Sequence, residues 1–80
     1  MTNLIASMEI VNTSLILNFG KNGNKYTVSI YDKETNDLTT NKFNKKEEAY
    51  KVFEKLSSWF LLGVYSEAQK RQYLATGTMK

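Results

Sequence analysis

The sequence predicts an α+β domain with three antiparallel strands, a long helix and a short C-terminal helix, in the order βββαα. Three observations support this prediction. Asn22-Gly23 separates two runs of β-prone residues, apolar residues recur at helical spacing from Ala49 onward, and Ser66 opens a helix-capping pattern. A chain of 80 residues has the length of one small domain, so residues 1–80 are expected to share one core.

The first two strands are expected to form a hairpin around Asn22-Gly23. Asn-Gly is the strongest signal for a two-residue loop, because both central residues of a type I′ turn need a positive φ. One face of this hairpin would be apolar, with the pairs Phe19–Tyr26, Leu17–Val28 and Leu15–Ile30. The other face would be mostly polar, with the pairs Asn18–Thr27 and Ile16–Ser29. We therefore expect one buried face and one wet face. A third, weaker strand is expected at LTTNKF, residues 38–43, after the turn residues DKETND.

The long helix is expected to start after Asn44, a favourable N-cap residue with Glu47 three positions later. Apolar residues then follow the i, i+3, i+4, i+7 spacing of one helix face: Ala49, Val52, Phe53, Leu56, Phe60, Gly63 and Val64. This stripe is expected to cover the apolar face of the hairpin. A second short helix is expected from Glu67 to Leu74, because Ser66 and Gln69 have the capping-box spacing.

The segment SSWFLLGVYS, residues 57–66, contains more large apolar side chains than one sheet can cover. Those outside the core stripe are Trp59, Leu61, Leu62 and Tyr65. They form either a small second core beneath residues 67–75 or a surface for self-association or for a partner. The second helix offers few apolar residues to cover them, and Trp and Tyr are favoured interface anchors. These four residues are the candidate partner-binding site.

The composition argues against an enzyme. The chain has no Cys and no His, which removes thiol chemistry, the common zinc sites and the usual neutral-pH general base. Asp32, Glu34 and Asn36 alternate as in an EF-hand loop, but Asp37 and Phe43 stand where that loop needs glycine and glutamate. We therefore expect no catalytic residue, no metal site and no cofactor. The N-terminus lacks a signal-peptide pattern, and no run of eighteen apolar residues occurs, so a cytoplasmic location is expected.

Residues Tyr26 to Ala49 include YTVSIYDKETN and FNKKEEA, which resemble the arm-type DNA-binding domain of phage and transposon integrases. In that family three strands precede a helix that begins with residues like F-x-x-K-E-A, and the sheet enters the major groove. The resemblance implies a small DNA-binding accessory factor. Under this alternative the candidate nucleic-acid contacts are Lys25, Tyr31, Lys42, Lys70 and Arg71.

A second resemblance concerns the whole chain. Its size, its richness in Lys, Asn, Ile and Tyr, and its lack of a catalytic set resemble accessory proteins of phages and mobile elements of low-GC Gram-positive bacteria, which include anti-CRISPR proteins. This resemblance implies a non-catalytic inhibitor that occludes a surface of a larger host protein, such as a nuclease or nucleoprotein complex, in the host cytoplasm. A homodimer is also compatible with it. The inhibitor is the first function hypothesis, and the DNA-binding factor is the alternative.

Overall fold

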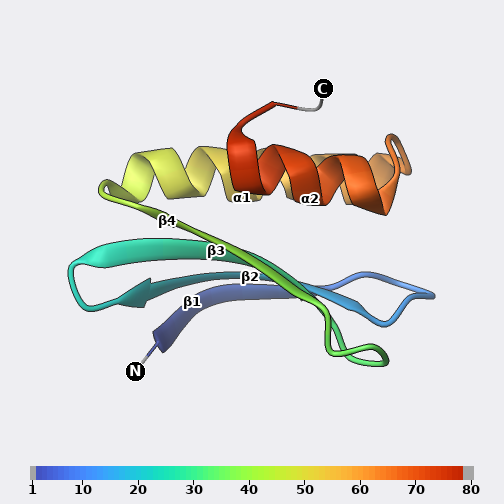
Figure 1. The fold of residues 1–80 in the computed structure, drawn as a ribbon, viewed down its shortest axis with the longest axis horizontal. Helices are drawn as coiled ribbons and strands as arrows, with labels where there is room; N and C mark the ends of the chain where they lie inside the picture. Colours follow the sequence, from blue (N-terminus) through green and yellow to red (C-terminus); the bar gives the residue numbers. More distant parts are fainter. Residues whose placement is uncertain (1, 79–80) are drawn as a thin grey trace.

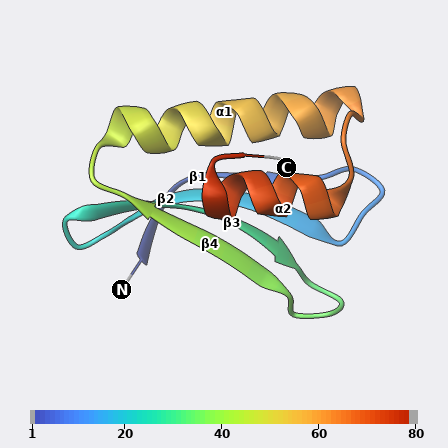
Figure 2. The ribbon, with the colours of Figure 1, turned by 45° about the horizontal axis from the view of Figure 1, so that its top comes forward.

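A four-stranded antiparallel sheet and two helices form the two layers of the computed structural model, which describes residues 2–78 (Figure 1). The elements in chain order are β1 Thr2–Glu9, β2 Leu15–Asn22, β3 Lys25–Asp32, β4 Leu38–Phe43, α1 Lys46–Leu62 and α2 Glu67–Thr76. The strands lie in the order β1-β2-β3-β4, which is a simple meander. Both helices lie on one face of the sheet (Figures 1 and 2). The predicted α+β class is confirmed.

The prediction of three strands is wrong, because residues 2–9 form an additional edge strand, β1. From Ala6 onward this strand alternates as a half-buried strand should: Ala6 and Met8 pack against the core, whereas Ser7 and Glu9 are exposed. The pairing with β2 is interrupted between Leu4 and Ala6, where Ile5 is an extra residue. Such a bulge changes which residues share a face and therefore hides the alternation in the sequence.

The predicted register of the β2–β3 hairpin is also wrong, by two residues. Leu17 pairs with Ile30 and Phe19 pairs with Val28, because the turn residues are Gly23-Asn24 and not Asn22-Gly23. Gly23 has a φ of 64°, and it is the only one of the two turn residues with a positive φ. Glycine at the first central position is characteristic of a type II′ turn. Since a shift of two residues keeps every side chain on its face, the prediction of a buried face and a wet face is confirmed.

The core lies between the sheet and the helices. Its buried apolar residues are Leu15, Leu17, Phe19, Val28 and Ile30 from the sheet, Ala49 and Leu56 from α1, and Leu74 from α2. The other face of the sheet has no described helix over it (Figure 1). A polar row crosses that face, formed by Ser7, Asn18, Ser29 and Thr40. Within the row, the hydroxyl of Ser7 donates to Asn18 Oδ1 at 2.7 Å.

The ends of α1 differ from the prediction. Lys45, not Asn44, is the N-cap, and it makes no side-chain capping bond. The side chain of Asn44 instead accepts a hydrogen bond from Lys25 Nζ and so connects the start of α1 to β3. At the other end Gly63 stops the helix with a φ of 69°. The N–H groups of Gly63 and Val64 bond to the carbonyls of Phe60 and Trp59, which is the pattern of a Schellman motif. Gly63 and Val64 therefore follow the helix and do not extend its apolar stripe.

Replacing Leu17 with alanine should reduce the free energy of unfolding by about 2–5 kcal/mol, because its side chain is fully buried and its removal leaves a cavity. A loss of this size is a large part of the stability of a small domain, typically about 5–15 kcal/mol. Urea denaturation followed by circular dichroism measures it. The matched variant Leu38→Ala removes a leucine that is 61% exposed on the open face, and should change stability by less than about 0.5 kcal/mol. Equal losses in the two variants would contradict the assignment of faces.

Candidate binding surfaces around the turn between the helices

The turn between α1 and α2 is held by several local interactions. Ser66 forms the capping box predicted from the sequence: its Oγ accepts from the Gln69 N–H at 3.1 Å, and Gln69 Oε1 accepts from the Ser66 N–H at 2.9 Å. The preceding residue, Tyr65, has a φ of 63°. A bulky residue in this left-handed region is strained and persists only where its surroundings hold it. The shape of this turn therefore depends on the contacts of Tyr65.

Trp59 belongs to a small aromatic cluster between the helices. Its ring lies 5.0 Å from the ring of Tyr65 and 4.9 Å from that of Tyr73, both in edge-to-face geometry. Trp59 is half-buried and packs against the main core. The sequence leaves two roles open for the SSWFLLGVYS segment, a small core beneath the second helix or a binding surface. Trp59 lies in such a core contact, between the two helices. Tyr65 contributes to the same cluster while remaining 48% exposed.

Leu61 and Leu62 have the opposite environment. They are 77% and 71% exposed, although they are large apolar residues in the last turn of α1. Val11, in the loop between β1 and β2, is 80% exposed and lines the same hollow of about 340 Å³ as Leu61, with Ile10 and Phe60 also in its wall. We call Val11, Leu61 and Leu62 the apolar end patch. Val11 was not among the sequence candidates, because nothing in the sequence brings a loop residue to the end of a helix fifty residues later.

Lys70, a candidate nucleic-acid contact, is enclosed in the fold. The residue is only 6% exposed, and its Nζ donates to the carbonyl of Tyr65 at 3.0 Å while lying 4.4 Å from the centre of the Phe60 ring. Burial lowers the pKa of this ammonium below its ordinary value, and the nearby Glu67 carboxylate opposes that change. Lys70 thus holds the strained Tyr65 in place.

Arg71, the next candidate, also acts within the fold. Its Nη1 donates to the carbonyl of Ile30 at 3.1 Å and to Thr39 Oγ1 at 2.8 Å, which ties α2 to β3 and β4. Its Nε donates to Glu67 Oε2 at 2.9 Å, one helical turn earlier. Nη2 is buried and makes no hydrogen bond to the described residues. Like Lys70, Arg71 is thereby engaged in positioning α2.

The three other nucleic-acid candidates, Lys25, Tyr31 and Lys42, share the uncovered face of the sheet. Lys42 is exposed, and its position pairs with Thr27 of β3. Lys25 is bonded to Asn44, and the hydroxyl of Tyr31 donates to Asn36 Oδ1 at 2.7 Å. The structure therefore divides the five candidates into three on the open face and two inside the fold.

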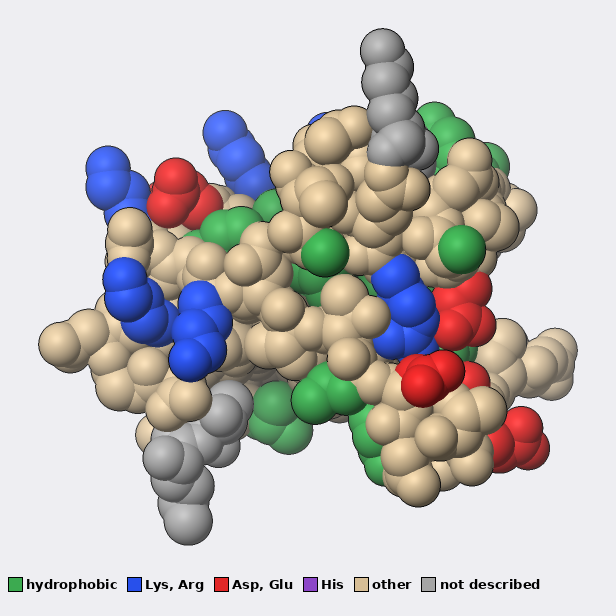
Figure 3. Space-filling view, in the orientation of Figure 1, with side chains coloured by type: hydrophobic (Ala, Val, Ile, Leu, Met, Phe, Trp, Pro, Cys, Tyr) green, Lys and Arg blue, Asp and Glu red, His purple; other side chains and the backbone are tan. Residues whose placement is uncertain are grey.

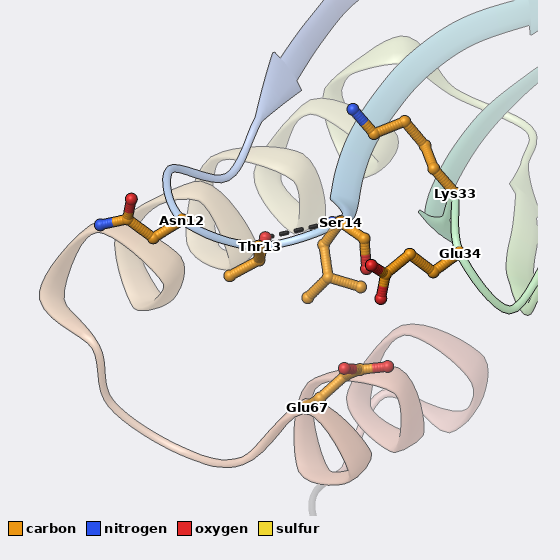
Figure 4. Close-up of a pocket in the computed structure, with 7 residues that line it drawn as sticks. Asn12, Thr13, Ser14, Lys33, Glu34 and Glu67 are labelled. Atoms are coloured by element: carbon orange, nitrogen blue, oxygen red, sulfur yellow. Dashed lines mark hydrogen bonds between the residues drawn. The ribbon is translucent and has the colours of Figure 1, made fainter.

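A polar hollow of about 660 Å³ adjoins the apolar end patch, with Asn12 in the wall of both hollows. Figure 4 shows the carboxylate of Glu34 next to Ser14 at the hollow, with the carboxylate of Glu67 facing them from α2. Ser14 Oγ donates to Asp32 Oδ1 at 2.6 Å, and this bond holds the pKa of Asp32 below its ordinary value. Within residues 2–78, no group of three or more acidic side chains is arranged to hold a metal ion.

No helix among the described residues is long and apolar enough to cross a membrane. Comparison of the chain with protein families, with curated proteins and with solved structures found no match. The functional argument therefore depends on the surfaces described above.

The buried ammonium of Lys70 gives a pH dependence that can be measured. Because its pKa is lowered from 10.5 in the folded state, the unfolded chain binds more protons just below that pH, and this residue's contribution to stability rises as the pH increases toward 10.5. Relative to Lys70→Met, the wild-type protein should therefore gain stability between about pH 7 and about pH 10 in urea titrations. Lys51→Met, at an exposed position, is the control and should show no such trend. If the difference in stability between the wild type and Lys70→Met does not change with pH, the ammonium of Lys70 must be hydrated in the folded protein.

Proposed function

We propose that this chain is a non-catalytic protein-binding domain that docks through the apolar end patch. The observation behind this proposal is the exposure of Val11, Leu61 and Leu62, each above 70%, with Val11 and Leu61 lining one hollow. Large apolar side chains gathered at one place on a small domain are typical of interaction sites. The hollow gives a partner's side chain a pocket to fill, as the centre of an interface requires.

The neighbouring surface supplies the rim of this interface. A stable interface buries roughly 800 Å² on each partner, which is more than three side chains provide. The polar hollow with Glu34 and Glu67 continues the surface on one side, and Tyr65, at 48% exposure, lies close to Leu62 in the chain. An apolar centre with a polar rim is the ordinary arrangement of a protein interface.

The strained turn supports the same role. Leu61 and Leu62 immediately precede Gly63, so their positions follow from the turn that Gly63, Tyr65 and Lys70 hold. A surface held in one conformation loses less freedom on binding and therefore binds more tightly. Strain in a backbone held by its surroundings is often found where a surface has a function.

The class of partner that we propose is a host nucleic-acid-processing or defence protein, whose surface this domain would occlude in the manner of an anti-CRISPR protein. The small size of the chain and its composition, rich in Lys, Asn and Tyr, support this part of the proposal. Neither an enzymatic group nor a cofactor is needed for such a role, since occlusion requires only binding.

The test compares three tagged proteins: the wild type, the end-patch variant Leu61→Gln/Leu62→Gln, and the control Leu4→Gln/Leu38→Gln. The control changes two leucines that are each 61% exposed but lie on the sheet. Each protein is used to capture partners from a nuclease-treated lysate of a low-GC Gram-positive bacterium, and the captured proteins are identified by mass spectrometry. We expect the wild type and the control to capture one defined nucleic-acid-processing protein. The end-patch variant should capture at least ~10-fold less of that protein, as is typical when hot-spot residues are replaced.

Sedimentation equilibrium of the same three proteins tests self-association. A dimer that dissociates only in the end-patch variant would show that the partner is a second copy of the chain, and would replace the host protein in the proposal. Equal capture by all three proteins would overturn the assignment of the interface to the end patch. Circular dichroism should be unchanged in each variant, because the altered side chains are exposed.

A further inference from the structure

Five exposed lysines from separate parts of the chain lie at one end of the molecule. Lys21 and Lys25 flank the β2–β3 turn, Lys42 is near the end of β4, and Lys45 and Lys46 begin α1. The pairing of Asn22 with Lys25, and of Tyr26 with Phe43, places these segments at the same end of the sheet. We call these five residues the basic end. In Figure 3 most Lys and Arg side chains lie on the left, where Figure 1 shows the β2–β3 turn and the start of α1.

The acids are distributed in the opposite way. Glu47 and Glu48, in the first turn of α1, are the acidic residues beside the five lysines. The remaining acids, apart from Glu54 in the middle of α1, lie toward the other end of the sheet: Glu9, Asp32, Glu34, Asp37 and Glu67. Lys33 is also at that end, where it pairs with Glu9 at 3.3 Å. The net charge of +3 is therefore a poor description of this molecule, which has one basic end and one acidic end.

We propose that the basic end binds the phosphate backbone of double-stranded DNA without sequence preference. Lysine ammonium groups on flexible stems neutralise phosphates as point charges and release condensed counterions, which is the main source of non-specific affinity. This surface lies at the opposite end of the sheet from the apolar end patch, and its activity does not depend on the protein-binding function proposed above.

The lysines at this end suit phosphates better than base edges, and this end lacks an arginine. Arginine reads guanine through two parallel hydrogen bonds, and the only arginine of the chain, Arg71, is engaged with Ile30 and Thr39 inside the fold. Lys25 has a fixed neighbour in Asn44, whereas Lys42, Lys45 and Lys46 make no hydrogen bond or ion pair of their side-chain nitrogens to the described residues. The interactions available at this end are therefore electrostatic.

A duplex fits this end better than a single strand does. Proteins that bind single strands usually stack successive bases on several exposed aromatic rings. Among the described residues near the basic end, Tyr26 is half-buried with Lys21 Nζ 5.6 Å from its ring centre, and Phe43 is half-buried against the core. Tyr50, at 49% exposure, is the one ring with substantial exposed area. A single ring does not form a stacking platform, but a set of lysines suits the dense charge of a duplex.

The test is fluorescence anisotropy with a labelled duplex of about 20 base pairs, titrated at salt concentrations from about 25 to about 200 mM. If three to four lysines each neutralise one phosphate, the logarithm of the association constant should fall with the logarithm of salt concentration with a slope of about −3 to −4. Two unrelated duplex sequences should bind equally. A single strand of the same length should bind more weakly.

The decisive comparison uses two variants with the same net charge. Lys42→Gln/Lys45→Gln/Lys46→Gln removes three charges from the basic end, and Lys33→Gln/Lys51→Gln/Lys55→Gln removes three exposed charges elsewhere. We expect the first variant to bind at least ~10-fold more weakly at the lowest salt, and its salt slope to be smaller in magnitude by about 2 to 3. The second variant should bind within about twofold of wild type. Thermal melting of both variants verifies that they fold.

Equal losses in the two variants would overturn the proposal, because binding would then reflect total charge. A slope near zero would overturn it as well. Binding of poly-L-glutamate as tightly as the duplex, at equal concentration of charge, would indicate an acidic protein surface as the ligand. If the single strand binds more tightly than the duplex, the proposal that this end prefers double-stranded DNA is wrong.

Discussion

The arrangement of the helical layer depends on two adjacent cations in α2. This helix buries only Leu74 completely among its apolar residues, so its apolar contact with the sheet is small. Successive side chains on a helix diverge by about 100°, which lets Arg71 reach β3 and β4 while Lys70 reaches back to Tyr65 in the turn. These contacts hold Tyr73 against Trp59 and fix the end of α1. The placement of the last turn of α1, which carries Leu61 and Leu62, therefore depends in part on buried charge in α2.

Much of the fold could be predicted from local patterns, and the errors have local causes. The Ser66 capping box and the helical stripe around Leu56 depend on short-range spacing, which the sequence contains in full. β1 was missed because the extra residue Ile5 interrupts the alternation on which strand prediction depends. The hairpin register depended on whether Gly23 is the first or the second residue of the turn, and both choices keep the same faces.

The candidate sites were less predictable, because they depend on contacts between distant residues. A lysine and an arginine beside a glutamine look like surface residues in the sequence, and only the tertiary structure shows that Lys70 and Arg71 are enclosed. The sequence leaves two roles open for the SSWFLLGVYS segment, and the structure divides its residues between them: Trp59 packs against the core and the ring of Tyr65, whereas Leu61 and Leu62, in the same last turns of α1, are exposed. The basic end combines lysines from β2, β3, β4 and the start of α1, and the strand pairing, not their order in residues 21–46, brings them to one end of the sheet.

The two charged ends can act independently. The longest dimension of the molecule is 32 Å, and the strands run along it in Figure 1. At physiological ionic strength exposed charges are screened over about 8 Å, so the acids around Glu34 and Glu67 do not neutralise the lysines at the other end. Closer to DNA the acidic end is repelled and the basic end attracted, which favours one orientation. If the basic end binds DNA as proposed, the apolar end patch, which adjoins the acids, points away from the duplex and stays accessible to the proposed protein partner.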